Sequence, residues 1–274
     1  MKEKKYLIDT TLRDGEQSPG FAFNIDEKVM LAQLMDKAGI YQIEAGVPAM
    51  GKYEKAAICE IIDKRINAKI STWNRMKKED IEHSFDCCPD IIHISAPVSY
   101  VHIYSKLKKN KIWLQRNLQE CVSCALDKGY TVTVGLEDAS RADITFIISI
   151  ANLLKDMGVA SIRFADTVGV LTPSRTYQTI RDIISNTGIS VGIHAHNDLG
   201  MAVANSLEAA KAGAAFIDTT LFGIGERAGN CDISQFTWAA DKLFDIKPSY
   251  SCINELIESA RYILKRIVVK IVRS

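Results

Sequence analysis

The sequence lacks any uncharged run of the roughly 18 residues that a membrane span requires. Its opening segment, MKEKKYLIDT, has neither the apolar stretch nor the small-residue cleavage site of a secretory signal. Lys and Arg number 34 against 33 Asp and Glu, so no strong overall charge recruits a membrane or a nucleic acid. These absences predict a cytoplasmic protein that acts on small molecules, with no nucleic-acid or membrane partner.

Cysteines are few, and their number is odd. The seven thiols fit reduced cysteines better than a disulfide framework in a chain of otherwise ordinary composition. Cys121 and Cys124 form a CxxC pair, but they fall within an expected helix and no second pair accompanies them. The pair is therefore a weak signal for a metal or redox site.

Two phosphate-binding fingerprints are also absent. No GxGxxG follows the first expected strand, and no GK[ST] completes the glycine-rich stretch at 223–230. The missing fingerprint argues against a doubly wound dinucleotide-binding sheet, which is kept as the alternative fold. The stretch at 223–230 instead offers a backbone that a bulky ligand can approach closely.

What the sequence does contain is a short β-branched run followed by an amphipathic helical stretch, eight times over. This alternation predicts an α/β protein with parallel strands and crossover helices, and eight repeats predict a TIM (β/α)8 barrel over residues 1–245. Apolar residues at three- and four-residue steps predict a C-terminal helical extension over 246–274. Strands are expected at 6–9, 42–46, 68–72, 91–95, 131–136, 161–165, 190–196 and 215–219. Helices are expected at 26–38, 52–64, 78–85, 111–128, 141–157, 173–186, 199–212 and 232–244.

Active sites of such barrels gather at the C-terminal ends of the strands. Asp14 follows the first expected strand, and His194 and His196 end the seventh. Residues two apart on a strand point to the same side, so both imidazoles can share a metal, with Asp14 as a hard third ligand. Two histidines and a carboxylate that leave coordination positions open suit a divalent ion that handles substrate.

Other polar residues on this rim have structural as well as chemical interpretations. Arg13, next to Asp14, can clamp a carboxylate or form a surface pair with Asp14. Glu137 follows the fifth strand and can act as an acid or base, or cap the next helix. Thr167 follows the sixth strand and can hold a substrate carboxylate or cap a loop.

Two motifs identify a family resemblance. LRDGEQ at 12–17 with Lys28, and HAHNDLGMAVA at 194–204, resemble the signatures of the isopropylmalate and homocitrate synthases, metal-dependent TIM barrels that join acetyl-CoA to a 2-oxo acid. The segments at 9–20, 43–51 and 135–143 are most similar to homocitrate synthases associated with nitrogen fixation. The resemblance covers most of residues 5–245. It implies an acyltransferase that condenses acetyl-CoA with 2-oxoglutarate to give homocitrate and CoA.

The resemblance also implies roles for individual residues. Asp14, His194 and His196 would bind a divalent metal, Mg²⁺ or Mn²⁺ with Zn²⁺ as an alternative, and Asn230 would lie near it. The remaining roles concern the substrates. Arg13 would meet the keto acid with Gln17 beside it, Thr167 would hold its carboxylate, Arg75 is a candidate for its distal carboxylate, and Glu137 would lie near the acetyl group.

One departure from the family pattern concerns the region after the barrel. Family members usually continue into a subdomain that brings a catalytic histidine and tyrosine to a neighbouring subunit, whereas no histidine follows His196 here. The sequence therefore predicts one subunit of a divided, oligomeric synthase, truncated relative to the family, in which a second polypeptide supplies that subdomain. Tyr250 or Tyr262 is the alternative source of the missing group.

Three other functions remain as alternatives. The substrate can be another 2-oxo acid, such as 2-oxoisovalerate or pyruvate. A related metal-dependent lyase or aldolase shares the barrel, but the spacing of Lys28 and the HAHND context argue against it. The third is a subunit that binds metal and keto acid but is inactive without a partner chain.

Overall fold

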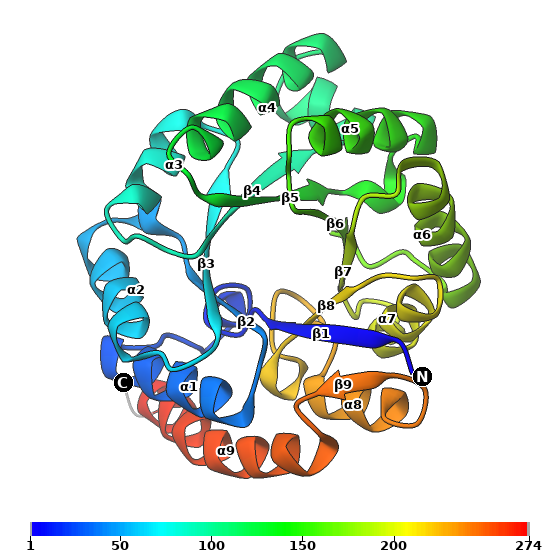
Figure 1. Ribbon diagram of the computed structural model, residues 1–274. Helices are drawn as coiled ribbons and strands as arrows, with labels where there is room; N and C mark the ends of the chain where they lie inside the picture. The colour runs from blue at the N-terminus through cyan, green and yellow to red at the C-terminus, as the bar shows by residue number, and fades with distance from the viewer. Residues whose placement is uncertain (1, 273–274) are drawn as a thin grey trace.

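The structure, a computed structural model, describes the backbone of residues 2–272 and the side chains of residues 2–264. Eight parallel strands close into a barrel, in the order β2 to β8 and then β1, which pairs again with β2 (Figure 1). The predicted TIM barrel is therefore confirmed. Its strands are β1 (Lys4–Asp9), β2 (Gln42–Gly46), β3 (Lys69–Arg75), β4 (Ile91–Pro97), β5 (Thr131–Glu137), β6 (Ser161–Asp166), β7 (Val191–Ala195) and β8 (Phe216–Thr219).

A ring of helices surrounds the strands. They are α1 (Ile25–Ala38), α2 (Lys52–Lys64), α3 (Lys78–Phe85), α4 (Lys111–Leu126), α5 (Ile144–Asp156), α6 (Pro173–Thr187), α7 (Ala202–Lys211), α8 (Ile233–Ala240) and α9 (Tyr250–Val272). Two helices begin three residues later than expected because a side chain fixes the first turn. Asp143 accepts hydrogen bonds from the backbone N–H of Thr145 and Phe146 at the start of α5, and Asn197 accepts one from Ala202 at the start of α7.

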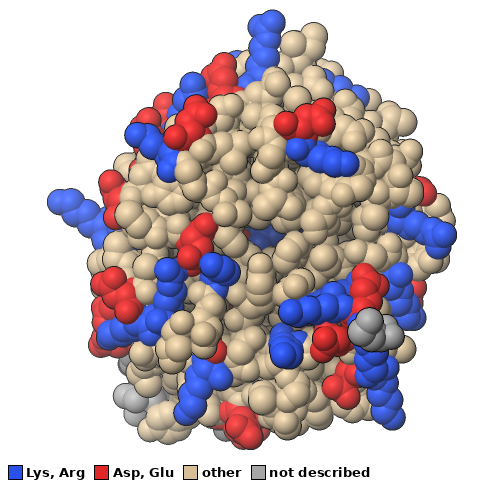
Figure 2. All heavy atoms as spheres, in the orientation of Figure 1, with Lys and Arg blue, Asp and Glu red and all other residues tan. Residues whose placement is uncertain are grey.

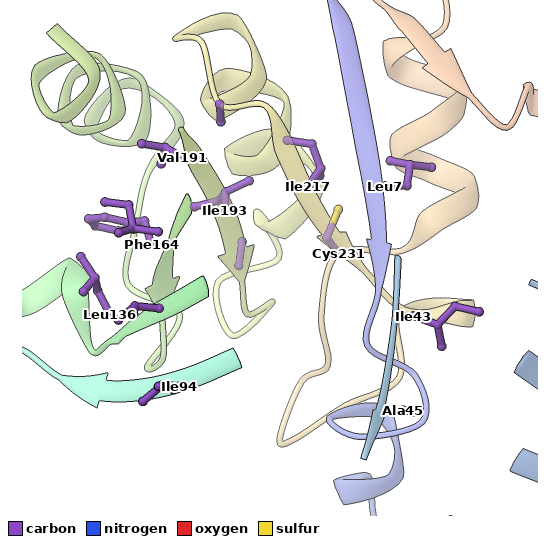
Figure 3. Packing of buried hydrophobic residues seen from close by; sticks show 14 of the residues in the cluster. Leu7, Ile43, Ala45, Ile94, Leu136, Phe164, Val191, Ile193, Ile217 and Cys231 are labelled. Carbon is purple, nitrogen blue, oxygen red and sulfur yellow. The ribbon is translucent and has the colours of Figure 1, made fainter. Parts of the chain in front are cut away.

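The strands alternate between two environments, as the period of two requires. Apolar residues at every second position face the helices and form the hydrophobic core; Figure 3 shows Leu7, Ile94, Leu136, Phe164 and Ile193 among them. The intervening positions face the barrel axis, and many of them are polar. In the described part of the chain, the interior-facing set includes Gln42, Glu44, Ser71, His93, Thr133, Arg163, His194 and Asp218.

A short strand that the sequence did not predict follows α8. β9 (Asp245–Lys247) pairs in parallel with the first half of β1, with Lys4 opposite Asp245. The expected helix at 232–244 ends at Ala240 for this reason. From β9 the chain enters α9, which lies beside α8 and α1 in Figure 1 and buries Ile253, Leu256 and Ala260.

The expected apolar stripe of the extension continues through Ile267, Val268 and Ile271, whose side chains lie outside the described residues. Within the described residues, no helix is both long enough and apolar enough to cross a membrane. On the face drawn in Figure 2, acidic and basic side chains are interspersed, as the near-zero net charge suggests.

Candidate active site

Three side chains from distant parts of the sequence meet at the C-terminal end of the barrel. Asp14 comes from the loop after β1, His194 from β7 and His196 from the residue just beyond it. One donor atom from each lies within 4.8 Å of the others, and all three residues are buried. The two Nε2 atoms are 3.3 Å apart, close to the separation of about 3 Å that adjacent ligands have at metal–nitrogen distances near 2.1 Å.

The surrounding groups leave these donors available to a metal. His194 Nδ1 lies 3.0 Å from Asp218 Oδ2, and since a carboxylate only accepts, Nδ1 carries a proton and Nε2 is the ring nitrogen that can bind a metal. Burial, followed by the neighbouring His194, lowers the pKa of His196 to about 4, so its imidazole is neutral near pH 7. Burial raises the pKa of Asp14, but the neighbouring Arg13 guanidinium outweighs this effect and holds the pKa below its usual value.

Asn230 completes the cluster. Its Nδ2 donates to Asp14 Oδ2 and to the Ile224 carbonyl, while its buried Oδ1 has no hydrogen-bond partner. A buried amide oxygen without a partner beside a carboxylate and two imidazoles is a donor set that suits a divalent cation. These residues therefore fit a divalent metal ion.

Two arginines extend the cluster into a buried network of alternating charge. Arg13 lies 2.8 Å from Asp14 and 2.6 Å from Glu44, and Arg163 lies 2.8 Å from both Glu44 and Asp218. Burial raises the pKa of Glu44, but the two guanidiniums outweigh it and keep the carboxyl ionised. Two cations against three carboxylates leave one net negative charge, which a divalent cation converts to one net positive charge. The filled site would then attract an anionic substrate.

A cavity of about 230 Å³ opens above this network. Besides the metal cluster, its walls contain the predicted Gln17, Glu137 and Thr167. The Thr167 hydroxyl accepts a hydrogen bond from the Asp138 N–H at 2.8 Å, so its own hydrogen remains available to a ligand. Glu137 Oε1 lies 3.0 Å from both Lys106 Nζ and His102 Nδ1.

The structure does not bring Arg75 to this cavity. Its guanidinium pairs with Asp80 at the start of α3, and its side chain is 57% exposed. The cations that face the cavity are instead Arg13, Arg163 and Lys106.

Sequence reasoning missed Arg163, His93 and Asp218 as site residues. Each interrupts an apolar strand, as in SIRFAD at 161–166, and strand alternation directs all three toward the barrel axis. His93 Nδ1 pairs with Thr133 Oγ1 at 2.8 Å, and its Nε2 faces Gly135, where an added Cβ would lie only 2.6 Å away. Burial and then Arg163 lower the pKa of His93 well below its usual value, so the ring is neutral.

A second buried ion cluster explains the Glu and Lys of the first motif. Lys28 Nζ on α1 lies 2.8 Å from both Glu16 and Glu54. Glu16 also accepts a hydrogen bond from the Phe23 N–H, and Glu54 accepts one from the Val47 N–H. These contacts fix the loop that presents Arg13 and Asp14 to the cavity.

The glycine-rich stretch forms a loop between β8 and α8 that reaches the cavity with Glu226. Arg227 fixes the loop by donating to both carboxylate oxygens of Asp198 and to the Thr167 carbonyl. At Gly225, an added Cβ would lie 2.0 Å from Asn230 Nδ2, so only glycine lets the loop pass this close to the metal cluster.

The CxxC pair, a weak signal for a metal or redox site, forms neither a disulfide nor a metal-binding group within the described residues. All seven cysteines are free, with Cys121 buried and Cys124 half-buried on α4. Among the described residues, Asp14, His194 and His196 form the one group of three or more side chains with suitable metal-binding geometry.

Comparisons with characterised sequences agree with this geometry. The HMGL-like family model matches residues 4–258. The chain is 45% identical to homocitrate synthase subunit alpha of Clostridium pasteurianum, over 94% of this chain and 96% of that protein. It is 43% identical to 2-isopropylmalate synthase 2 of Caldanaerobacter subterraneus and 42% identical to homocitrate synthase 1 of Nostoc. These alignments cover 85% and 89% of this chain but only 61% and 64% of those longer relatives.

Solved structures share the fold at low sequence identity. An HMG-CoA lyase of Bacillus subtilis superposes with a TM-score of 0.85 at 16% identity, over 97% of this chain and 94% of the lyase. The carboxyl transferase domain of Rhizobium etli pyruvate carboxylase superposes with a TM-score of 0.79 at 14% identity, over 97% of this chain and 49% of that chain. Given the family match and the identities to the synthases, this chain belongs to the HMGL-like family, together with the homocitrate and 2-isopropylmalate synthases.

Proposed function

We propose that this chain is the barrel subunit of a homocitrate synthase, an acyltransferase that condenses acetyl-CoA and water with 2-oxoglutarate to give homocitrate and CoA. The observation that carries the proposal is the buried Asp14, His194 and His196 cluster beside Arg13, in a chain 45% identical to homocitrate synthase subunit alpha. Mg²⁺ or Mn²⁺ is the expected cation, because a carboxylate and an amide oxygen accompany the two imidazoles.

The residues divide the chemistry between them. A divalent cation supplies Lewis acidity to the keto group and the adjacent carboxylate of the 2-oxo acid. Arg13 donates to the oxygen that gains negative charge when the acetyl enolate carbon bonds to the keto carbon. Thr167 donates to the substrate carboxylate, and Gln17 orients it. Hydrolysis of the thioester then releases CoA and makes the reaction irreversible.

Glu137 has a distinct role near the acetyl group. Its carboxylate faces the cavity beside Lys106 and His102, and it is not held by an arginine as Glu44 is. In this proposal it takes up or releases a proton of the acetyl-derived carbon.

The charge of the cavity favours a dicarboxylic keto acid. Arg163, Lys106 and His93 line it together with Ser95. The distal carboxylate of 2-oxoglutarate can accept hydrogen bonds from these groups, whereas the apolar branch of 2-oxoisovalerate cannot. 2-Oxoglutarate is therefore the substrate we propose. Another 2-oxo acid remains the second candidate, because a 2-isopropylmalate synthase is 43% identical.

We also propose a partner chain. The Clostridium relative, of which this chain covers 96%, is named a subunit alpha. A second polypeptide would supply the remaining proton-transfer groups, and without it this chain would bind metal and keto acid but turn over slowly.

A free-thiol assay tests the function. The chain, with Mg²⁺ or Mn²⁺ and with or without the co-expressed partner, is given acetyl-CoA and 2-oxoglutarate, 2-oxoisovalerate or pyruvate. Release of CoA with 2-oxoglutarate at a kcat/KM well above the other two acids is the expected result, with homocitrate identified by mass spectrometry. Preference for another acid would shift the proposal to that synthase, and no release under any condition would refute it.

A further inference from the structure

The connection from β4 to α4 carries an unusual concentration of positive charge. Residues 91–119 contain no Asp or Glu, whereas five cations fall within them. They are Lys106, Lys108, Lys109, Lys111 and Arg116. Because the whole chain has a net charge of +1, this local excess is a specific feature of the segment.

The segment lies at the mouth of the cavity. Lys106 lines the cavity, and its Nζ is 3.0 Å from Glu137. Lys108 and Lys109 are exposed, and among the described residues neither has a carboxylate within ion-pair distance, while Lys109 Nζ lies 5.2 Å from the centroid of the Trp113 ring. The nearby Asp143 is engaged as the cap of α5. The excess positive charge is therefore open to an anion from solution.

Two aromatic rings accompany the lysines. Tyr100 and Tyr104 stack with ring centroids 6.0 Å apart and planes at 16°, although the two residues are 45% and 49% exposed. Lys111 Nζ donates to the Tyr100 hydroxyl at 2.8 Å and lies 4.5 Å from the ring centroid. The backbone from Val101 to Lys106 forms one π-helical turn, a conformation that is frequent at functional sites.

Exposed aromatic rings next to lysines that have no carboxylate partner match the chemistry of a nucleotide. Aromatic side chains stack on heteroaromatic bases, and lysine ammonium groups bind phosphates as point charges. We propose that the segment Tyr100–Lys111 binds the 3′-phospho-ADP part of CoA. The adenine stacks on the pair formed by Tyr100 and Tyr104, and the phosphates contact Lys108 and Lys109.

This inference rests on the proposed function and extends it to the end of the substrate that does not react. The neutral pantetheine arm would pass Lys106 and bring the thioester to Glu137. The remote nucleotide would then contribute equally to binding in the ground state and in the transition state, which raises the affinity for acetyl-CoA without changing the chemical step.

A charge-neutralising pair of substitutions tests the nucleotide site. In the holoenzyme, Lys108→Gln/Lys109→Gln should weaken CoA binding, measured by calorimetry, by roughly tenfold or more. It should raise the KM for acetyl-CoA while leaving kcat and the KM for the keto acid unchanged. With S-acetylpantetheine, which lacks the nucleotide, the variant and the wild type should behave alike.

The matched control is Lys128→Gln/Lys242→Gln, which removes two exposed lysines at the other end of the barrel and should leave all these values unchanged. Tyr104→Leu tests the stacking separately and should weaken CoA but not pantetheine binding. If the wild type binds CoA and both segment variants bind it equally well, the nucleotide site is refuted and the synthase proposal stands. If the wild type binds no CoA with metal, keto acid and partner present, the synthase proposal itself fails.

Discussion

At the scale of single residues, the two histidines of the site are oriented in different ways. Asp218 on β8 holds His194 through Nδ1, whereas His196 Nδ1 is buried without a hydrogen-bond partner. Carboxylate partners of this kind fix the tautomer and ring orientation of a ligating imidazole. His194 is therefore preorganised before any cation arrives.

Replacing Asp218 should weaken metal binding without removing a ligand. We expect Asp218→Asn to reduce Mn²⁺ affinity by about 10- to 100-fold, because the amide no longer selects the ligating tautomer of His194. Calorimetric titration with Mn²⁺ measures this change, and Asp156→Asn at the exposed end of α5 is the control. Unchanged affinity in a correctly folded Asp218→Asn protein would contradict the role given to Asp218.

The buried carboxyl of Asp9 should make the free energy of unfolding depend on pH. Burial raises its pKa from 3.8 to about 7, so the folded protein keeps a proton that the unfolded chain has already lost between these values. The wild type therefore loses stability as the pH rises from about 4 to 7, by up to about 1.4 kcal/mol per pH unit. Asn has no proton to lose, so the free energy of unfolding of Asp9→Asn should increase relative to that of the wild type as the pH rises across this range.

Urea unfolding of the metal-free proteins at pH 5, 6 and 7 measures the difference. The advantage of Asp9→Asn over the wild type should grow by roughly 2 kcal/mol between pH 5 and 7. Asp63→Asn on the exposed face of α2 should show no such trend. A constant difference for Asp9→Asn would mean that Asp9 is ionised throughout.

The sequence was sufficient to predict some residues of the site, and there is a physical reason why it could not predict the others. Asp14, His194 and His196 could be predicted to lie together because each follows or ends a predicted strand, and the C-terminal ends of TIM-barrel strands meet at one rim. Arg163 and Asp218 could not be assigned to the site. The role of a charged side chain within a strand depends on which side chains it contacts across the barrel interior, and the sequence does not give these contacts. Arg75 ends a strand at the same rim, yet a local contact with Asp80 holds it outside the cavity.

At the scale of elements, the loop between β8 and α8 depends on the absence of one side chain. Gly225 lies where an added Cβ would be 2.0 Å from Asn230 Nδ2 and 3.2 Å from Asp14 Oδ2. We expect Gly225→Ala to displace Asn230 and to lower metal affinity by more than roughly tenfold, since two neighbouring donors are disturbed. Titration with Mn²⁺ provides the measurement.

Gly158→Ala is the comparison for this change. Gly158 has a positive φ of 89° with no atom within 4 Å of an added Cβ, so alanine there strains only the backbone. It should lower stability by about 1 kcal/mol and leave metal affinity unchanged. Equal metal affinities for the two alanine variants would show that the loop tolerates the added methyl group.

Secondary structure was predictable where a pattern is local. Strands with β-branched alternation and helices with capping residues lie within a few residues of their predicted positions. β9 was not predicted because three residues are too few to show an alternating pattern. Its pairing also depends on the edge of β1, 241 positions earlier in the chain. The π-helical turn after β4 likewise follows from packing that no local pattern encodes.

At the scale of the whole molecule, α9 completes the outer ring of helices between α8 and α1. Ile253 in its first turns is fully buried. Ile253→Ala should destabilise the protein by about 2–5 kcal/mol through lost burial and the cavity left behind. Urea unfolding measures this loss, and Glu255→Ala on the exposed side of α9 should change stability by less than about 0.5 kcal/mol. Comparable effects of the two substitutions would show that α9 does not pack as described.

The metal cluster joins the beginning of the barrel to its end: Asn230 donates to Asp14 across 216 positions, and β1 pairs with β8. During synthesis on the ribosome, the donor set therefore stays incomplete until nearly the whole barrel has emerged. Cation capture then coincides with closure of the last seam, so that a fragment released early would compete poorly with the finished protein for the ion.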